Sequence, residues 1–253
     1  MRALLILLVL CGAACECGAA RAERLEIGLS DERIGITSSF SGTRMTVFGT
    51  IEDPEDLVLE RGGYDVVVAL AGPSDEMVVR RKARLAGIWV NGASQLFAGV
   101  PASYALSATR PLDEIAAPRD LALLQIGADN LLFAPRGTVA EDREDFARSL
   151  KRLMRRRGLY SEAPSAVFLS PTLFRATLPV PANVPIGRHV AQAFLFRDGR
   201  YIGSSSAELT VQKTGFEQVT YDFAHEHGLL YGLAAVLVAV LTGWLASVAF
   251  RRD

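Results

Sequence analysis

A chain of 253 residues with 27 basic and 28 acidic side chains carries a formal net charge of −1. This balance gives no electrostatic case for binding a polyanion, so it argues against a nucleic-acid partner. Half of the residues are hydrophobic. The excess is concentrated at the two ends of the chain, which must be set aside before the fold of the middle is considered.

Residues 1–22 have the pattern of a secretory signal peptide. Arg2 supplies a short positive region, residues 3–10 form an apolar core, and Ala20-Arg21-Ala22 provides a small-x-small cleavage site. We therefore expect the leader to be removed and the mature chain to begin near Glu23.

All three cysteines, Cys11, Cys15 and Cys17, lie within this leader, so no disulfide is available to the mature domain. Residues 23–217 are numerous enough to fold by core burial alone. Two alternatives are retention of the leader as an N-terminal anchor and lipidation of Cys15.

The first half of the domain has apolar residues that alternate with polar ones or form short runs, a pattern typical of strands. In residues 43–52, for example, Met45, Val47 and Ile51 share one face. Asn91-Gly92 is predicted to form a tight hairpin turn. The predicted strands cover residues 24–30, 33–38, 43–52, 64–71, 76–81, 85–90 and 94–99.

A helical segment is predicted at about residues 111–160. Two short helical pieces, 111–116 and 119–126, precede a longer helix that begins at the capping box Thr138-Val139-Ala140-Glu141 and ends at Gly158. The predicted apolar stripe of the longer helix consists of Phe146, Leu150 and Leu153.

Strand patterns return after the helical segment, with Asp198-Gly199 as a hairpin turn and Ser204-Ser205-Ser206 as a bulge. We therefore predict a mainly-β fold, an immunoglobulin-like antiparallel β-sandwich of residues 23–217 with the helical insertion at about residues 111–160. Two small β domains joined by the helical segment are the alternative. The later predicted strands cover residues 166–169, 173–178, 188–196 and 200–212.

Residues 229–250 form an uninterrupted apolar run that is long enough, as a helix, to cross a hydrocarbon core of roughly 30 Å. Because Arg251 and Arg252 follow it, the positive-inside bias places the tail, residues 251–253, in the cytoplasm. With an export signal in front, we expect a single-pass protein of the bacterial inner (cytoplasmic) membrane. Its N-terminal domain would lie in the periplasm and would be joined to the span by a juxtamembrane segment, residues 218–228.

Two groups in or near the span are candidates for contacts. Gly243 and Ser247 form a small-xxx-small pair, which predicts close approach of another membrane helix. Asp222, His225 and Glu226 include metal-ligand types, and the alternative is that they are polar residues at the membrane interface.

Basic residues cluster twice in the domain. Arg80, Lys82 and Arg84 share one face of an extended segment, where three cations can bind a small oxyanion or an anionic partner. The alternative is that their charges protect an edge strand from pairing with other chains. The run Arg155-Arg156-Arg157 either contacts lipid headgroups or compensates the helix dipole.

Familiar catalytic motifs are missing from the mature sequence. It has no cysteine nucleophile, no Gly-x-Ser-x-Gly elbow, no glycine-rich phosphate loop and no His-Glu-x-x-His pair. We therefore expect a protein that is not an enzyme and has no cofactor, with an unrecognised hydrolase as the alternative.

The leader, the segment VRRKARLAGIWVN at residues 79–91, the following Pro101-Ala102-Ser103-Tyr104 and the terminal span together resemble a family of transmembrane proteins found in alphaproteobacteria. The resemblance covers essentially the whole chain. In that family the gene often neighbours one for a sulfite-exporter-type permease, which implies an accessory role beside an anion transporter. We therefore expect a membrane-anchored periplasmic binding or accessory module whose partners are an integral membrane transporter and the lipid bilayer. A stand-alone envelope scaffold or assembly chaperone that binds polypeptide through a sheet edge is the alternative.

Overall fold

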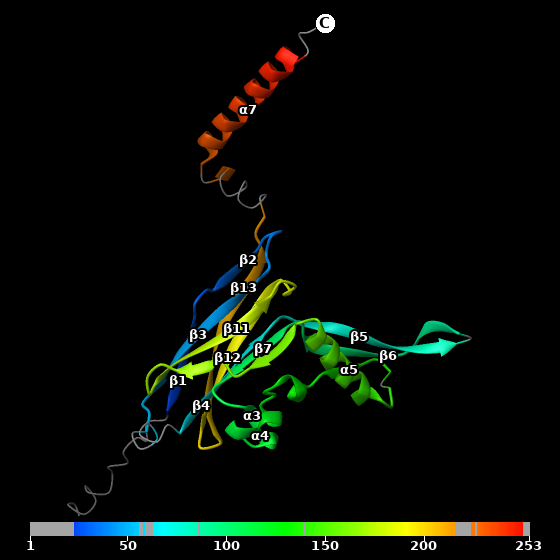
Figure 1. The fold of residues 1–253 in the computed structure, drawn as a ribbon, viewed down its shortest axis with the longest axis vertical. Helices are drawn as coiled ribbons and strands as arrows, with labels where there is room; N and C mark the ends of the chain where they lie inside the picture. The colour runs from blue at the N-terminus through cyan, green and yellow to red at the C-terminus, as the bar shows by residue number, and fades with distance from the viewer. Residues whose placement is uncertain are drawn as a thin grey trace, which may run out of the picture.

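The structure, a computed structural model, describes residues 23–55, 58, 63–85, 87–138, 140–215, 224–225 and 227–249. Two sheets enclose a common core, helices cover the outer face of the larger sheet, and a long hairpin projects to the side (Figure 1). The prediction of a mainly-β fold with one C-terminal apolar helix is confirmed. The predicted signal peptide and the predicted cytoplasmic tail lie outside the described residues.

The smaller sheet consists of four strands, in spatial order β1 (Arg24–Leu29), β3 (Gly42–Glu52), β11 (Leu173–Pro181) and β10 (Ala166–Phe168). All neighbouring pairs in it are antiparallel. Met45, Val47 and Ile51 of β3 are buried in the core between the sheets, as their alternation predicted. Because β3 pairs with β11, the first half of the chain is held by the second within a single sheet.

The larger sheet consists of six strands, in spatial order β2 (Arg33–Ile36), β13 (Arg200–Lys213), β12 (Gly187–Arg197), β4 (Tyr64–Ala71), β7 (Tyr104–Ala108) and β9 (Tyr160–Ala163). The outer pairs β2–β13 and β7–β9 are parallel, whereas the central pairs are antiparallel. β4 packs against the smaller sheet with one face and against the helical layer with the other. Its nearly continuous apolar sequence follows from this double burial.

The hairpin between β12 and β13 turns at Asp198-Gly199, as predicted, with φ angles of 47° and 83°. The predicted bulge at Ser204-Ser205-Ser206 is wrong, since these serines pair regularly with β12. The pairing shifts instead between Leu195 and Phe196, opposite the extra residue Ile202. An extra residue there increases the local twist close to the turn.

The third sheet consists of β5 (Ser74–Leu85), β6 (Ile88–Pro101) and β8 (Ala134–Arg136). β5 and β6 form one long hairpin, and the predicted turn at Asn91-Gly92 is wrong. Asn91 pairs with Lys82 inside the hairpin, and the chain reverses between Leu85 and Ile88. The reversal uses Gly87, whose φ of 85° is a conformation that glycine adopts without a steric penalty.

The helical layer consists of α3 (Leu112–Ile115), α4 (Pro118–Leu123), the 3-10 turn η1 (Ala128–Asn130) and α5 (Arg143–Arg156). The two short helices are confirmed, but α5 begins later than its predicted capping box at residues 138–141. The N-cap position is occupied by Asp142, which makes no side-chain cap hydrogen bond. The segment before it is held by the hairpin instead, because the Gln95 amide oxygen accepts a hydrogen bond from Ala140 N at 2.8 Å.

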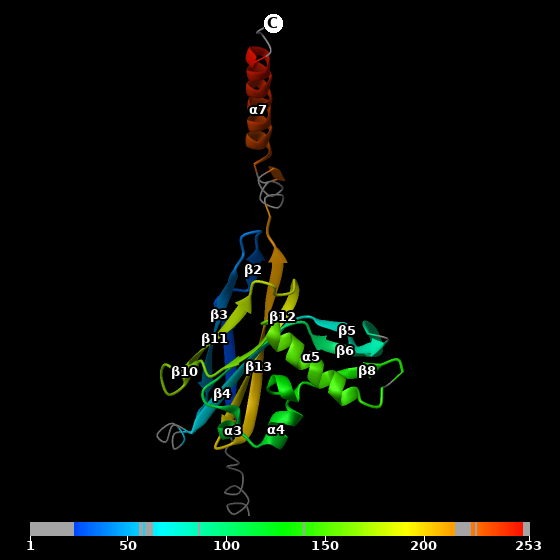
Figure 2. The same ribbon diagram turned by 45° about the vertical axis from the view of Figure 1, so that its right-hand side comes forward.

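The buried stripe of α5 differs from the predicted one at its third position. Phe146 and Leu150 are buried as predicted, but Leu153 is 42% exposed and Met154 is 1% exposed. Figure 2 shows α5 lying beside β5 and β6. Phe146, Leu150 and Met154 form a row with a spacing of four, which is inclined to the helix axis, so the buried stripe crosses α5 obliquely and takes in Met154 in place of Leu153.

The C-terminal helix α7 (Gly228–Ala249) lies apart from the sandwich in both views of the fold. Its segment Gly228–Ser247 has a mean hydropathy of 2.2 and is long and apolar enough to cross a membrane. The hydroxyl of Thr242 donates to the Val238 carbonyl at 2.7 Å, so this polar group is satisfied within the helix, as a hydrocarbon environment requires.

Candidate functional site

The outer end of the β5–β6 hairpin projects away from the sheets (Figure 1). Past the middle of β5, Arg81 still holds the hairpin to α5: its Nη2 lies 2.6 Å from Asp142 Oδ2, and its guanidinium lies 4.8 Å from the centre of the Phe146 ring. Beyond this contact, residues 82–85 and 87–94 are all exposed. The outer part of the hairpin is therefore available for a contact outside the domain.

One face of the hairpin is basic. Arg80, Lys82 and Arg84 occupy alternate positions of β5, and Arg81, between the first two, contacts α5. The pairing with β6 shifts at this point, where Arg81 stands opposite the two residues Gly92 and Ala93. Within the described part of the chain, none of the three has an ion pair or a side-chain hydrogen bond. We call these three residues the basic face.

An apolar cluster at the end of the hairpin was missed in the sequence. Leu85 pairs with Ile88 across the turn, and their side chains are 69% and 68% exposed. Trp89, opposite Arg84, is 65% exposed, and Val90 is 38% exposed. We call Leu85, Ile88, Trp89 and Val90 the apolar tip. The misplaced turn concealed it, because a turn at Asn91-Gly92 makes residues 85–90 an ordinary strand of the sandwich.

A serine-histidine pair is buried where β7 begins. Ser103 Oγ lies 3.2 Å from His189 Nε2, and His189 Nδ1 lies 3.2 Å from the Gly187 carbonyl oxygen. A carbonyl can only accept, so Nδ1 carries the proton of the neutral ring and Nε2 accepts from the serine hydroxyl. Burial lowers the pKa of His189 below its usual value, although the Gly187 contact acts in the opposite direction.

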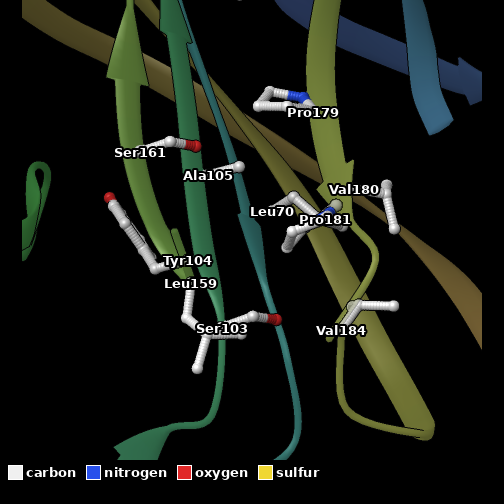
Figure 3. A pocket seen from close by; sticks show the side chains of 10 residues that line it. All are labelled: Leu70, Ser103, Tyr104, Ala105, Leu159, Ser161, Pro179, Val180, Pro181 and Val184. Atoms are coloured by element: carbon white, nitrogen blue, oxygen red, sulfur yellow. The ribbon is translucent and has the colours of Figure 1, made fainter. Parts of the chain in front are cut away.

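The cavity beside Ser103 is too small for a substrate. Its volume is about 10 Å³, which is at most room for one water molecule. Figure 3 shows Ser103 and Tyr104 on one side of this cavity and Pro181 and Val184 on the other. We therefore interpret the hydrogen bond between Ser103 and His189 as a structural contact in the core.

His189 should make the fold less stable at low pH. Its folded pKa is lower than the unfolded value of 6.5, so the unfolded chain binds an extra proton as the pH falls below about 6.5. Stability should then decline by up to about 1.4 kcal/mol per pH unit until the folded pKa is reached. Urea unfolding between pH 5 and pH 8 measures the decline as a difference between the wild-type protein and His189→Gln.

The variant His189→Gln serves as the reference for this experiment, because it removes the titrating ring and keeps a polar side chain at the same position. If His189→Gln and the wild-type protein showed the same pH dependence, a neutral buried His189 would be contradicted.

A larger surface pocket of about 230 Å³ has a mainly apolar lining and includes Arg110 and Glu162. Both charged groups are engaged by the fold. Arg110 Nε and Nη2 donate to the buried carboxylate of Asp65 at 3.0 and 2.5 Å, and Glu162 accepts a hydrogen bond from Ala128 N. These charges therefore hold strands and helices together.

The remaining candidates lie near α7. Asp222 and Glu226, two of the three metal candidates, lie outside the described residues, and His225 is described without them. Among the residues that the structure describes, no group of three metal-ligating side chains could hold an ion. Gly243 and Ser247 are both exposed on α7, one helical turn apart, and no atom lies within 4 Å of where a Cβ of Gly243 would be.

These features define a membrane-associated, mainly-β module with a helix of membrane-spanning length. The chain belongs to the family described as "Putative transmembrane protein (Alph_Pro_TM)", which matches residues 24–252. No curated protein matches the chain. Among solved structures, it is similar to AggA, the major subunit of aggregative adherence fimbriae type I from Escherichia coli. The identity is 12% and the TM-score is 0.26, with 76% of this chain and 95% of that chain covered.

Proposed function

We propose that the protein is an accessory module of the bacterial inner membrane, with its sandwich in the periplasm, that binds an integral membrane transporter. The basic face is the observation that carries the proposal. Arg80, Lys82 and Arg84 stand on an exposed hairpin, and within the described residues they have no counter-charge. Uncompensated cations attract an acidic protein surface or an anion and orient its approach.

The transporter that we propose is an exporter of sulfite-type anions. Arg80 and Arg84 offer planar guanidinium groups that bind oxyanions through two parallel hydrogen bonds, and Lys82 adds a point charge. The helix α7 keeps the module in the same bilayer as the transporter, which raises its effective concentration. The proposed role is binding, and it assigns neither a chemical step nor a cofactor to the protein.

Replacing Arg80, Lys82 and Arg84 together by glutamine should lower the amount of copurified transporter about tenfold or more, since one interfacial charge contact contributes on the order of 1.4 kcal/mol or more. Crosslinking in intact membranes, followed by quantitative mass spectrometry of the neighbours, measures the loss.

The control for this triple variant removes the same charge elsewhere. Arg119, Arg152 and Arg200 are exposed arginines outside the hairpin, and their replacement by glutamine should leave copurification unchanged. A wild-type preparation that contains no transporter would count heavily against the proposed function.

The membrane helix provides a second arm of the same experiment. Gly243→Leu with Ser247→Leu should reduce association by blocking close helix approach, while insertion of α7 is retained. Ala234→Leu is the matched control, because nine residues at 100° each place it on the opposite side of the helix from Gly243. Unchanged association of the Gly243 and Ser247 variant would mean that α7 is only a tether.

A second candidate function is favoured by the position of β5. This strand of 12 residues lies at the edge of the third sheet, whereas the edge strands β9 and β10 have only 4 and 3 residues. A long edge can accept an extended peptide by main-chain hydrogen bonding, as an envelope scaffold or assembly chaperone would. Such binding would persist in the triple glutamine variant, and this outcome distinguishes the two functions.

A further inference from the structure

We propose that the apolar tip of the β5–β6 hairpin docks on the anionic surface of a lipid bilayer. Leu85, Ile88 and Trp89 enter the interface, and Arg84 and Lys82 contact the lipid phosphates. This inference goes beyond the proposed function, because it requires the membrane alone and no transporter.

The exposed apolar area is the first support for this contact. Leu85, Ile88 and Trp89 each expose about two thirds of their surface, 69%, 68% and 65%. Keeping apolar surface in water costs roughly 25 cal/mol per Å², and contiguous patches of this kind mark protein or membrane contacts. Tryptophan favours the membrane interface, where its ring is in an apolar layer and its N–H is near water.

The order of the charges along the hairpin matches the layers of a bilayer. Arg84 lies one residue behind Leu85 and Lys82 lies three behind it, which at about 3.3 Å per residue places them about 3 and 10 Å from the tip. The headgroup layer of one leaflet is roughly 5–8 Å thick, and long basic side chains can extend toward it from either side. Residues 77–101 contain four basic and no acidic residues, so anionic lipid is favoured.

A second copy of the chain fits this surface less well. If β5 paired antiparallel with β5 of another molecule around Lys82, Arg80 of each would lie opposite Arg84 of the other. Like charges directly across a strand pair are destabilising. A bilayer surface brings phosphates to the same positions.

The chain before α7 is long enough to let the domain turn so that the tip meets the bilayer that holds α7. The hairpin begins beside Gly187, where a Cβ would lie 3.3 Å from Pro73, and Gly187 pairs with Val211 near the end of β13. From this point the tip lies about 40 Å away, which is the length of β5 at about 3.3 Å per residue. The chain between β13 and α7, residues 214–227, can span at most about 50 Å.

Trp89 provides a direct test, because the protein has two tryptophans and the other, Trp244, lies in α7. Full-length Trp244→Phe protein is reconstituted into vesicles of phosphatidylglycerol and phosphatidylcholine that contain brominated lipid. Trp89 emission should shift to shorter wavelength and lose most of its intensity. Vesicles of phosphatidylcholine alone should give much less quenching, since they lack the anionic charge.

Matched variants separate the tip from general hydrophobicity. In the Trp244→Phe background, Leu85→Ser with Ile88→Ser should abolish most of the quenching. Leu123→Ser with Leu132→Ser should leave it intact, since these leucines are equally exposed (72% and 71%) and lie outside the hairpin, at the end of α4 and between η1 and β8. Unchanged thermal unfolding confirms that each variant is folded.

Three outcomes would overturn the inference: no quenching in anionic vesicles, equal quenching in vesicles of both compositions, or protection of Trp89 from aqueous iodide that grows with protein concentration. The first result would show that lipid does not cover the tip. The second would show that the net negative charge of the lipid does not contribute to binding, and the third that a second copy of the chain covers the tip. None of these results determines whether the transporter copurifies, so the proposed function is tested independently of this inference.

Discussion

Truncating Met154 to alanine should lower the free energy of unfolding by about 2–4 kcal/mol, because a fully buried side chain leaves a cavity when it is removed. Met154 is 1% exposed and lies in the core between the helical layer and the larger sheet. Leu153→Ala should cost less than about 1 kcal/mol, the usual range for a surface change, since Leu153 is 42% exposed. Chemical denaturation of the full-length protein in detergent measures both values.

Met154→Ala and Leu153→Ala form a matched pair of variants. Both changes put alanine into the same helix at adjacent residues, so the gain in helix propensity nearly cancels. If Leu153→Ala were the more damaging change, α5 would be rotated by about 100° relative to its observed packing.

Gly49→Ala should destabilise the protein by about 2–3 kcal/mol, the range for forcing extra volume into a packed core. Gly49 lies directly opposite Phe174 in the β3–β11 pair, with the phenyl ring over its Cα. An added Cβ would lie 2.5 Å from Phe174 Cε1 and 2.7 Å from the Glu26 carbonyl oxygen. The midpoint of urea unfolding reports the loss.

A glycine on the neighbouring strand provides the control. Gly28 in β1 has no atom within 4 Å of an added Cβ, so Gly28→Ala should be neutral or stabilising by up to about 1 kcal/mol. Phe174→Leu should cost less in the Gly49→Ala background than alone, because each change affects the same space. Strict additivity of Gly49→Ala and Phe174→Leu would contradict the contact.

Local patterns in the sequence were sufficient for most of the strands, for one hairpin turn and for the C-terminal helix. Met45 and Val47 predict the buried face of β3 because side chains alternate across any strand, whatever it pairs with. Asp198-Gly199 predicts its turn because these residues adopt the left-handed backbone that the turn requires. The apolar length of α7 predicts a spanning helix in the same way.

The basic face could also be placed from the sequence. The spacing of Arg80, Lys82 and Arg84 puts them on one side of any extended segment. Their exposure and the absence of a counter-charge within the described residues depend on what packs nearby, which spacing does not specify.

Tertiary structure alone decided where the hairpin turns, which face of α5 is buried and which distant groups meet. Asn91-Gly92 and Gly87 are both acceptable local turns, and the choice follows from how far β5 and β6 remain paired. Ser103 and His189 are 86 residues apart, and Asp65 and Arg110 are 45 apart, so no local pattern joins them. The apolar tip emerged only once the turn was placed. Residue spacing fixes which side chains share a face, whereas what covers that face depends on contacts between distant parts of the chain.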